Sequence, residues 1–519
     1  MIGMVLDFGS QSHFLAALLP ETVLALTAIV VLLGDVIQRG SDDSSSKPWI
    51  VAVSLAGVAL AIGANVVLGT FDVQNEFSMI AVDGFRLTVN FILLGVTGLA
   101  ILYSIDYLER EGLQIGEYYA LLLLASVGMM LMVAARDLVV LFLALELMSI
   151  SIYVLVCLKR SDPRSAEAAL KYFLVGAFAS AFLLYGIALL YGATGSTNLT
   201  LVGAEVMRAA SEGSLLLFAG VGLLLIGFGF KVSAVPFHMW TPDAYEGAPT
   251  PVTGYMAAGV KVAGFAAVVR LFNIQLAPVE SVWVSVLWWL ALFTMIVPNL
   301  IALAQDNVKR MLAYSSIAHA GYILVAVVSA NALGRSAIVF YLAVYGLMTL
   351  GAFAIVYVVA GRRDARVFLS DYRGLGWRRP LLGLALVVFL LSLAGFPPTG
   401  GFVGKLYILR AALDAGQVAL AVTLVLTSLL SYYYYLRVVW KMYFEEMPEG
   451  TPIPARPGGA FQAATAVSAI GILAAGLLPG PAIDRIDDAT EALRPGSPTL
   501  PFTSPAVAPE ASGEGSVLE

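Results

Sequence analysis

Apolar stretches of similar length recur along almost the whole chain, and they constrain its fold more than any other feature of the sequence. A helix needs about 20 apolar residues to cross the hydrocarbon core of a bilayer, and we find about 14 stretches of that length. The stretches are residues 14–35, 49–70, 86–106, 117–134, 137–158, 167–192, 214–235, 251–275, 281–304, 309–330, 335–360, 381–410, 416–442 and 459–479. The sequence therefore predicts an all-α, polytopic membrane protein.

The composition excludes most other classes of protein. The 519 residues are 60% hydrophobic and 12% charged, whereas about 25% of the residues of an average soluble domain are charged. The single cysteine, Cys157, cannot hold an iron–sulfur cluster, a structural zinc ion or an intrachain disulfide. The sequence also lacks the GxxxxGK[ST] loop that cradles phosphates. We therefore expect no cofactor and no metal ion on this chain.

The basic residues between the stretches predict how the chain is oriented. Connections that follow odd-numbered stretches hold about twice as many lysines and arginines as the opposite connections. Because basic residues stay in the cytoplasm, the odd-numbered stretches are expected to end there. Since the number of stretches is even, both termini then lie on the outer side of the membrane. His13, close to the N-terminus, is expected at the membrane interface.

Two proline-rich breaks interrupt the apolar pattern, one at Pro236 and one at Pro397-Pro398. Each break lies in the fourth stretch of a run of five. Because five is odd, the second run enters from the opposite side, which predicts two inverted five-helix repeats containing broken helices. The predicted parts are an N-terminal three-helix segment at 1–110, a first repeat at 117–275, a second, inverted repeat at 281–442, a C-terminal helix at 459–480 and a disordered tail at 481–519.

Once the basic residues that set the orientation are set aside, three lysines remain inside apolar stretches, Lys231, Lys261 and Lys405, and Glu146 lies deep in a fourth stretch. Glu146 lies about 13 Å along a helix from Asp137, and Lys261 lies about 15 Å from Pro251, so both approach the middle of the membrane. Each buried charge there costs at least about 2.5–3.5 kcal/mol. This cost indicates that the four charges serve a function.

Two interpretations of these charges stay open. They could hold helices together as buried ion pairs, and lysines near helix ends, such as Lys171, could extend to water. They could also form a proton or ion path, because a buried lysine, unlike an arginine, changes its protonation when a charged neighbour moves. We favour the path, because unwound backbone at membrane depth lines hydrated or protein-lined cavities. The same breaks favour a relay role over simple packing for His238 and His319.

Three long motifs carry a resemblance to a known family. KVSAVPFHMWTPDAYEGAPTPV, NVKRMLAYSSIAHAGY and SLAGFPPTGGFVGK resemble the antiporter-like membrane subunits of the bacterial proton-pumping NADH:quinone oxidoreductase, respiratory complex I. Those subunits share ancestry with multisubunit sodium/proton antiporters. PETVLALTAIVVLLGD and the lysine in GGFVGKLYIL are most similar to the N-type members of the family, also called subunit two. The resemblance covers nearly all of residues 15–480.

The resemblance implies a role for each matching residue in a proton relay. It implies a carboxylate–lysine pair in the first half-channel, a central lysine, a lysine in the second half-channel, two linking histidines and one further functional lysine; these are Glu146, Lys231, Lys261, Lys405, His238, His319 and Lys171. It also implies that NADH, FMN, the iron–sulfur clusters and quinone are bound by partner subunits. The partners would be the other membrane-arm subunits in the lipid of the bacterial inner membrane, with no nucleic acid.

Three rival functions remain. The nearest is a subunit of a multisubunit Na⁺/H⁺ antiporter, which works without electron transfer. A free-standing carrier or lipid flippase would need a central cavity lined by hydrogen-bonding side chains, whereas the deep polar residues here are almost all ionisable. A spacer that only bridges its neighbours is the third. The sequence favours proton translocation driven by redox chemistry elsewhere in the complex.

Overall fold

The computed structural model describes residues 5–6, 11–38, 48–73, 78–113, 115–450, 453–491 and 493. In that part of the chain, twelve helices are long and apolar enough to cross a membrane, and two shorter apolar helices accompany them. The regular non-helical structure described there is one parallel pair of two-residue strands, β1 (Val5–Leu6) and β2 (Asp72–Val73). The prediction of an all-α, polytopic membrane protein is confirmed, and all 14 predicted stretches contain helix in the structure.

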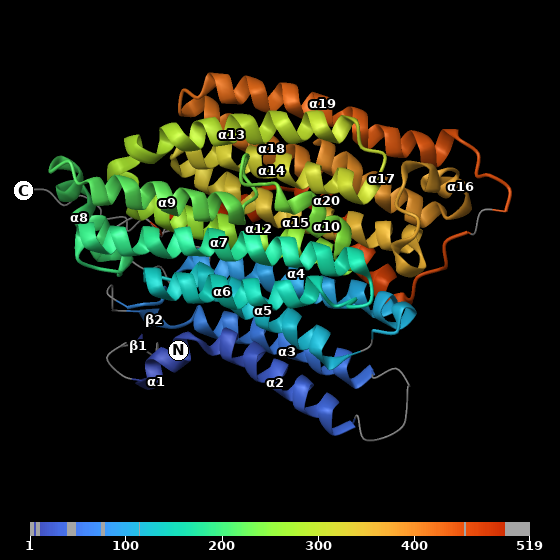
Figure 1. The fold of residues 1–519 in the computed structure, drawn as a ribbon, viewed down its shortest axis with the longest axis horizontal. Helices are drawn as coiled ribbons and strands as arrows, with labels where there is room; N and C mark the ends of the chain where they lie inside the picture. The colour runs from blue at the N-terminus through green and yellow to red at the C-terminus, as the bar shows by residue number, and fades with distance from the viewer. Residues whose placement is uncertain are drawn as a thin grey trace, which may run out of the picture.

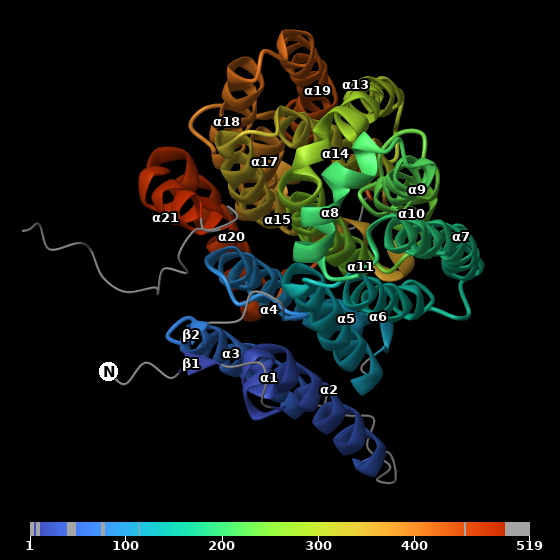
Figure 2. The same cartoon turned by 90° about the vertical axis from the view of Figure 1, so that its left-hand side faces the viewer.

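The N-terminal helices lie at one edge of the bundle. They are α1 (Gln11–Ala17), α2 (Leu19–Gln38), α3 (Pro48–Leu68) and α4 (Gly84–Glu111). In Figure 1 the long helices run side by side, and in Figure 2 α2 and α3 lie furthest from the centre. Helix α4 lies further in, where it contacts α15 and α20. It begins at the N-cap Asp83 and ends at Gly112, whose φ of 68° suits glycine.

The next run of helices corresponds to the first predicted repeat. Its elements are α5 (Gly116–Ala134), α6 (Leu138–Val156), α7 (Pro163–Thr194), α8 (Leu199–Ser211), α9 (Leu215–Lys231), α10 (Trp240–Gly247), α11 (Thr250–Tyr255), α12 (Lys261–Val268), and the π-helical turns η1 (Met256–Val260) and η2 (Val269–Gln275). The side chains of Asp137 and Asp162 cap α6 and α7. Elements α11 to η2 form one continuous span that is buried from Thr250 to Asn273.

The following run corresponds to the second predicted repeat and extends from the centre of the bundle to the edge opposite α2 and α3 (Figure 2). Its elements are η3 (Ala277–Val279), α13 (Glu280–Leu303), α14 (Val308–Ser329), α15 (Ala332–Ala360), η4 (Arg362–Asp364), η5 (Leu369–Tyr372), α16 (Leu375–Arg378), α17 (Pro380–Ala394), α18 (Gly400–Asp414) and α19 (Val418–Phe444). Helices α14 and α15 are the most deeply buried of this run, and Figure 2 shows both surrounded by other helices. The inverted relation between the two runs stays a prediction.

Both predicted breaks are present. Helix α9 ends at Lys231, and the chain resumes a helix at Trp240 after the cis Val235–Pro236 bond. Helix α17 ends at Ala394, and α18 begins at Gly400 after the cis Pro397–Pro398 bond. The structure therefore places non-helical backbone at the two positions that the prolines indicate, and the prolines themselves are exposed at the side of the bundle.

The C-terminal region differs from the prediction. Helix α20 (Gly459–Leu477) matches the expected C-terminal helix, but a further helix, α21 (Gly480–Glu491), follows it. Ile483, Ile486 and Ala489 are buried there, and Ser336 and Thr490 share a 2.8 Å hydrogen bond. This corrects the expected disordered tail at 481–519 for residues 481–491, because the short amphipathic face packs on α4 and α15. Residues 494–519 lie outside the described part.

Candidate functional site

The three deep lysines are buried on three helices. Lys231 on α9, Lys261 on α12 and Lys405 on α18 are only 2%, 1% and 6% exposed. Glu146 on α6 is partly buried. A buried ammonium group needs hydrogen-bond partners to offset its lost hydration. The partners of each lysine therefore indicate what the site can do.

Glu146 and Lys231 lie near each other but do not touch. The ammonium of Lys231 donates to Ser149 Oγ at 2.8 Å, and Ser149 lies one helical turn after Glu146 on α6. The carboxylate of Glu146 accepts a hydrogen bond from Ser180 on α7. Among the described residues these two groups form no ion pair within 4.0 Å. The structure thus holds the predicted carboxylate–lysine pair apart, each member on its own serine.

Lys261 is held by helix α14. Its ammonium donates to the main-chain oxygen of Ser316 and, at 2.6 Å, to the Oγ of the same residue. Tyr345 on α15 also donates to Ser316 Oγ, at 2.8 Å, and the Lys261 ammonium lies 5.6 Å from the centre of the Tyr345 ring. Serine and tyrosine hydroxyls both donate and accept, so Lys261 faces groups that can accept its proton.

His319 lies between two tyrosine hydroxyls. Its Nδ1 lies 2.6 Å from the hydroxyl oxygen of Tyr341, and its Nε2 lies 3.1 Å from that of Tyr435. The Tyr435 hydroxyl also hydrogen-bonds with Ser315. The imidazole ring lies against Tyr345, with a centroid distance of 5.3 Å. Through this contact with Tyr345, His319 lies next to the residues that hold Lys261.

Lys405 lies next to the second break in the helices. Its ammonium donates at 2.8 Å to the main-chain oxygen of Ala394, the last residue of α17. It also lies 4.8 Å from the centre of the Tyr322 ring. Asn299 donates to the Tyr322 hydroxyl at 3.2 Å and accepts from Tyr434 at 2.9 Å. Lys405 therefore contacts a further set of hydrogen-bonded hydroxyl and amide groups.

These groups form one sequence of side chains, which we name the polar row. It consists of three hydrogen-bonded groups and Lys405, which meet through aromatic rings. The groups are Lys261, Ser316 and Tyr345; His319, Tyr341, Tyr435 and Ser315; and Asn299, Tyr322 and Tyr434, over whose Tyr322 ring the Lys405 ammonium lies. The ring of Tyr322 lies 5.4 Å from His319. The polar row joins the central lysine to the lysine at the second break.

Lys231 approaches the polar row without joining it. Its Cγ lies close to Gly264, three residues after Lys261 on α12, and a Cβ at that glycine would lie 3.7 Å from it. Among the described residues no side-chain hydrogen bonds connect Lys231 with Lys261. The first half of the site is therefore adjacent to the polar row but separate from it.

Two predicted residues lie away from the polar row. His238, in the first break, is partly buried, and among the described residues it makes no side-chain hydrogen bond with the three lysines. Lys171 is 47% exposed and pairs with Glu167 at 2.7 Å and with Asp243 at 3.1 Å. The roles predicted for both residues stay predictions.

Lys171 belongs to a charged network at the basic end of the helices. Asp243 also pairs with Arg310 at 3.0 Å, and Arg310 pairs with Glu246 at 2.6 Å. Beside this network the Asp364 carboxylate lies 3.4 Å from the Lys309 ammonium and accepts from Thr250 at 2.9 Å. Burial by itself would raise the pKa of Asp364, but the positive charges of Lys309 and Lys159 hold it below its usual value.

Sequence reasoning missed the serines and tyrosines of the polar row. Ser315, Ser316, His319 and Tyr322 come from the single motif YSSIAHAGY on α14, where they recur at helical spacing. The SYYYYL run on α19 supplies Tyr434 and Tyr435. A polar face within an apolar stretch was the available signal. Among the described residues no cluster of three or more histidine, cysteine or acidic side chains could hold a metal ion.

Comparisons with known proteins show which family the chain is similar to. A family model described as NADH:quinone oxidoreductase/Mrp antiporter, TM, matches residues 135–431. NADH-quinone oxidoreductase subunit N of Trichlorobacter lovleyi is 47% identical over 436 residues, which are 84% of this chain and 88% of that protein. A chain of respiratory complex I from Thermus thermophilus has a TM-score of 0.75 and 36% identity, over 91% of this chain and 100% of that chain.

A more distant structure shares the fold. A chain of the Mrp complex from Dietzia sp. DQ12-45-1b has a TM-score of 0.78 but only 24% identity, over 91% of this chain and 97% of that chain. That likeness shows a common architecture alone.

Proposed function

The chain belongs to the NADH:quinone oxidoreductase/Mrp antiporter transmembrane family and, within it, to subunit N of NADH-quinone oxidoreductase, and from this we propose that it carries protons across the membrane arm of that complex. One observation supports the proposal above all others. The polar row leads from Lys261 to Lys405 through hydroxyl, imidazole and amide groups, with both lysines almost fully buried. Hydroxyl and imidazole groups both donate and accept hydrogen bonds, which fits a proton path.

The central step is proton transfer away from Lys261. The Lys261 ammonium already donates to Ser316 Oγ, which also accepts from Tyr345. A proton released there moves toward His319, whose two ring nitrogens each face a tyrosine hydroxyl. The last step, past Tyr322 to Lys405, would need a bridging water molecule, since His319, Tyr322 and Lys405 meet there through ring contacts. Lysine suits both ends of this path, since it exists in charged and neutral forms.

The Glu146 and Lys231 pair would control that step. In the structure each is held by a serine, at Ser180 and Ser149. A carboxylate close to Lys231 stabilises its ammonium form, and separation of the two weakens that effect. Lys231 is packed beside the helix of Lys261. When Lys231 is charged it repels positive charge on Lys261, and when it is neutral this repulsion is lost. Because the groups are coupled, their titration belongs to the set.

The electron transfer of the complex would occur on other subunits. This chain has one cysteine and three histidines, too few to ligate iron–sulfur clusters or several haems. NADH, FMN, the iron–sulfur clusters and quinone would therefore be bound by partners in the complex. This subunit would receive a conformational or electrostatic signal from them.

The orientation follows from the basic residues. The end of the bundle with Lys159, Arg164, Lys309 and Arg310 would face the cytoplasm of a bacterial inner membrane. Both termini would lie on the outer side. The Na⁺/H⁺ antiporter alternative has less support, since its relative shares only 24% identity, against 36% for the complex I chain.

The test is proton translocation by the assembled complex. We expect Lys261→Ala and Glu146→Ala to lower the number of protons moved per electron, with NADH oxidation and assembly largely kept. Lys261→Arg is the matched variant, because it keeps the charge but does not release its proton, and it should fail in the same way. An unchanged proton-to-electron ratio in Lys261→Ala would rule out the relay. Retained pumping in Lys261→Arg would show that the charge only holds the helices together.

A further inference from the structure

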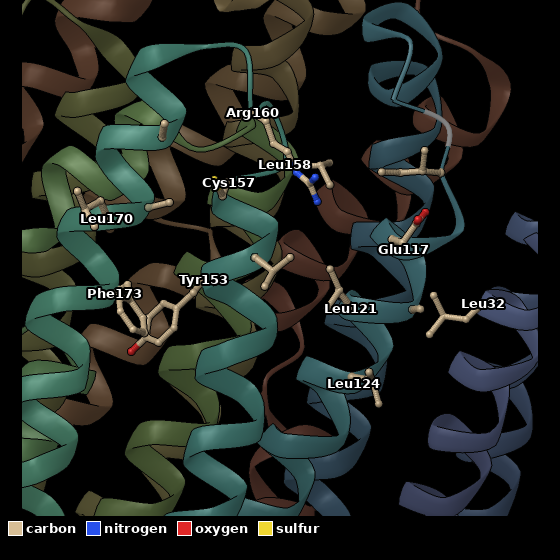
Figure 3. A pocket seen from close by; sticks show the side chains of 15 residues that line it. Leu32, Glu117, Leu121, Leu124, Tyr153, Cys157, Leu158, Arg160, Leu170 and Phe173 are labelled. Carbon is tan, nitrogen blue, oxygen red and sulfur yellow. The ribbon is translucent and has the colours of Figure 1, made fainter. Parts of the chain in front are cut away.

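A large groove opens on the side of the bundle away from the polar row. It lies between α2, α5, α6 and α7 and has a volume of about 930 Å³. Sites for small organic ligands typically have volumes of about 300–1,000 Å³. Figure 3 shows its lining, which is mostly apolar, with Arg160 and Glu117 toward one end and Tyr153, Phe173 and Leu124 further along the helices.

Arg160 is the distinctive residue of this groove. It is exposed, and in the described part of the chain its guanidinium has no hydrogen-bond or ion-pair partner. Its basic neighbours are satisfied: Lys159 pairs with Glu111 at 3.1 Å, and Arg164 pairs with Asp162 at 3.1 Å. A guanidinium binds phosphate with two parallel hydrogen bonds. The groove therefore presents a phosphate-binding group at one end.

The rest of the groove suits a hydrocarbon chain. Leu170 and Phe173 on α7 are 58% and 49% exposed, and Leu121 and Leu124 on α5 line the groove on the other side of α6 (Figure 3). The groove runs along membrane-spanning helices, so its apolar lining lies at the depth of the lipid tails. A charged end continued by an apolar trough has the polarity pattern of a membrane lipid.

We propose that this groove binds one glycerophospholipid of the bilayer, with its phosphate on Arg160 and an acyl chain along the apolar lining. Basic pockets between transmembrane helices at the cytoplasmic surface bind lipid head groups by this combination of charge and apolar contact. A helix of a neighbouring subunit would instead have to bury the Arg160 charge, which favours the lipid. The site is independent of the proton path.

Cys157 provides the measurement. It lines the groove, is partly buried and is the single cysteine of the chain. The intact complex is purified in a maltoside detergent, depleted of lipid and treated with N-ethylmaleimide, and alkylation of the Cys157 peptide is followed by mass spectrometry. We expect alkylation to accelerate on depletion. Added phosphatidylethanolamine should restore protection, whereas diacylglycerol, which lacks the phosphate, should not.

Variants distinguish the lipid from other occupants. Arg160→Gln should require about tenfold more phosphatidylethanolamine for the same protection, as loss of one charged hydrogen-bond pair predicts. Arg160→Lys keeps the positive charge and should retain most of the protection by phosphatidylethanolamine. Arg164→Gln, the matched loss of a nearby exposed charge, should behave like the wild type. Protection that survives depletion would show that protein covers the groove, and equal protection by diacylglycerol would exclude phosphate recognition; either result overturns the proposal.

Discussion

The ammonium of Lys405 donates a 2.8 Å hydrogen bond to the main-chain oxygen of Ala394, the residue at which half-helix α17 ends. The carboxyl end of a helix carries partial negative charge and unpaired carbonyl groups. The break at Gly395 therefore creates an acceptor for Lys405 in the middle of the apolar core. The proline break and the lysine that follows it are parts of one local arrangement.

The first prediction concerns Gly395→Ala. Gly395 has φ of 84°, and an added Cβ would lie 2.8 Å from Lys405 Cδ. The substitution should cost about 1–2 kcal/mol through backbone strain and also displace the lysine, so proton pumping should fall in assembled complex. Gly416→Ala is the control, since it has a φ of 71° and open space around its Cβ position. If the Gly395→Ala and Gly416→Ala complexes pumped protons equally well, the glycine at position 395 would not be needed for the function of Lys405.

The second prediction concerns the tyrosines around His319. Tyr435→Phe removes the hydroxyl that faces both His319 and Ser315. We expect slower proton translocation and a loss of about 1–3 kcal/mol in stability, because buried partners are left unsatisfied. Tyr433 is 61% exposed, so Tyr433→Phe should change neither quantity. The measurement is the proton-to-electron ratio of the two complexes, and identical ratios would remove Tyr435 from the path.

The third prediction concerns acid stability at the pair of Asp83 and Arg270. The two groups form hydrogen bonds of 2.8 and 3.1 Å that join the start of α4 to η2. Burial alone would raise the pKa of Asp83, but the charge and hydrogen bonds of Arg270 lower it to about 2. A depressed carboxyl pKa contributes stability above the unfolded value of about 3.9, and this stability is lost as the pH falls toward 2.

Asp83→Asn tests that relationship by thermal unfolding of the purified complex. The variant should be less stable at pH 7 by about 2 kcal/mol or more. It should also lose the part of the acid sensitivity that lies between about pH 4 and pH 2. If the wild type and the variant lost the same amount of stability between about pH 4 and pH 2, Asp83 would not be a source of the acid sensitivity.

The fourth prediction concerns Lys171. The Lys171 side chain is 47% exposed, so removal of its two ion pairs in Lys171→Ala should leave the stability of the complex almost unchanged. If Lys171 serves only this surface network, proton pumping should fall far less than in Lys261→Ala. If Lys171→Ala lowered proton pumping as much as Lys261→Ala does, Lys171 would be part of the relay, as its sequence context predicts.

The sequence predicted the features that depend on local pattern. Spanning length, the breaks at Pro236 and Pro397-Pro398, and the buried positions of Lys231, Lys261 and Lys405 all follow from residue type and spacing along the chain. These features need no knowledge of which helices meet. The cost of a charge in hydrocarbon already identifies the positions that require an explanation.

The remaining features depend on which helices pack together. Tyr345 and Tyr435 lie on different helices from Ser316 and His319, so the polar row exists only after α14, α15 and α19 have met. The same holds for Glu146, which the family resemblance pairs with Lys231 but which the structure joins to Ser180. In α21 the acidic residues conceal a short apolar face, which only contact with α4 and α15 reveals.

The position of His319 has a consequence for the order of events. A neutral imidazole carries hydrogen on one nitrogen and accepts on the other, and both nitrogens of His319 already face hydroxyl groups. A proton that enters at one nitrogen and leaves from the other exchanges the tautomer of the ring. Contacts with Tyr322, Tyr341 and Tyr345 oppose a ring flip that would restore it. After one proton has passed, His319 therefore carries its hydrogen on the other ring nitrogen. The original tautomer must be restored before a second proton can pass in the same direction.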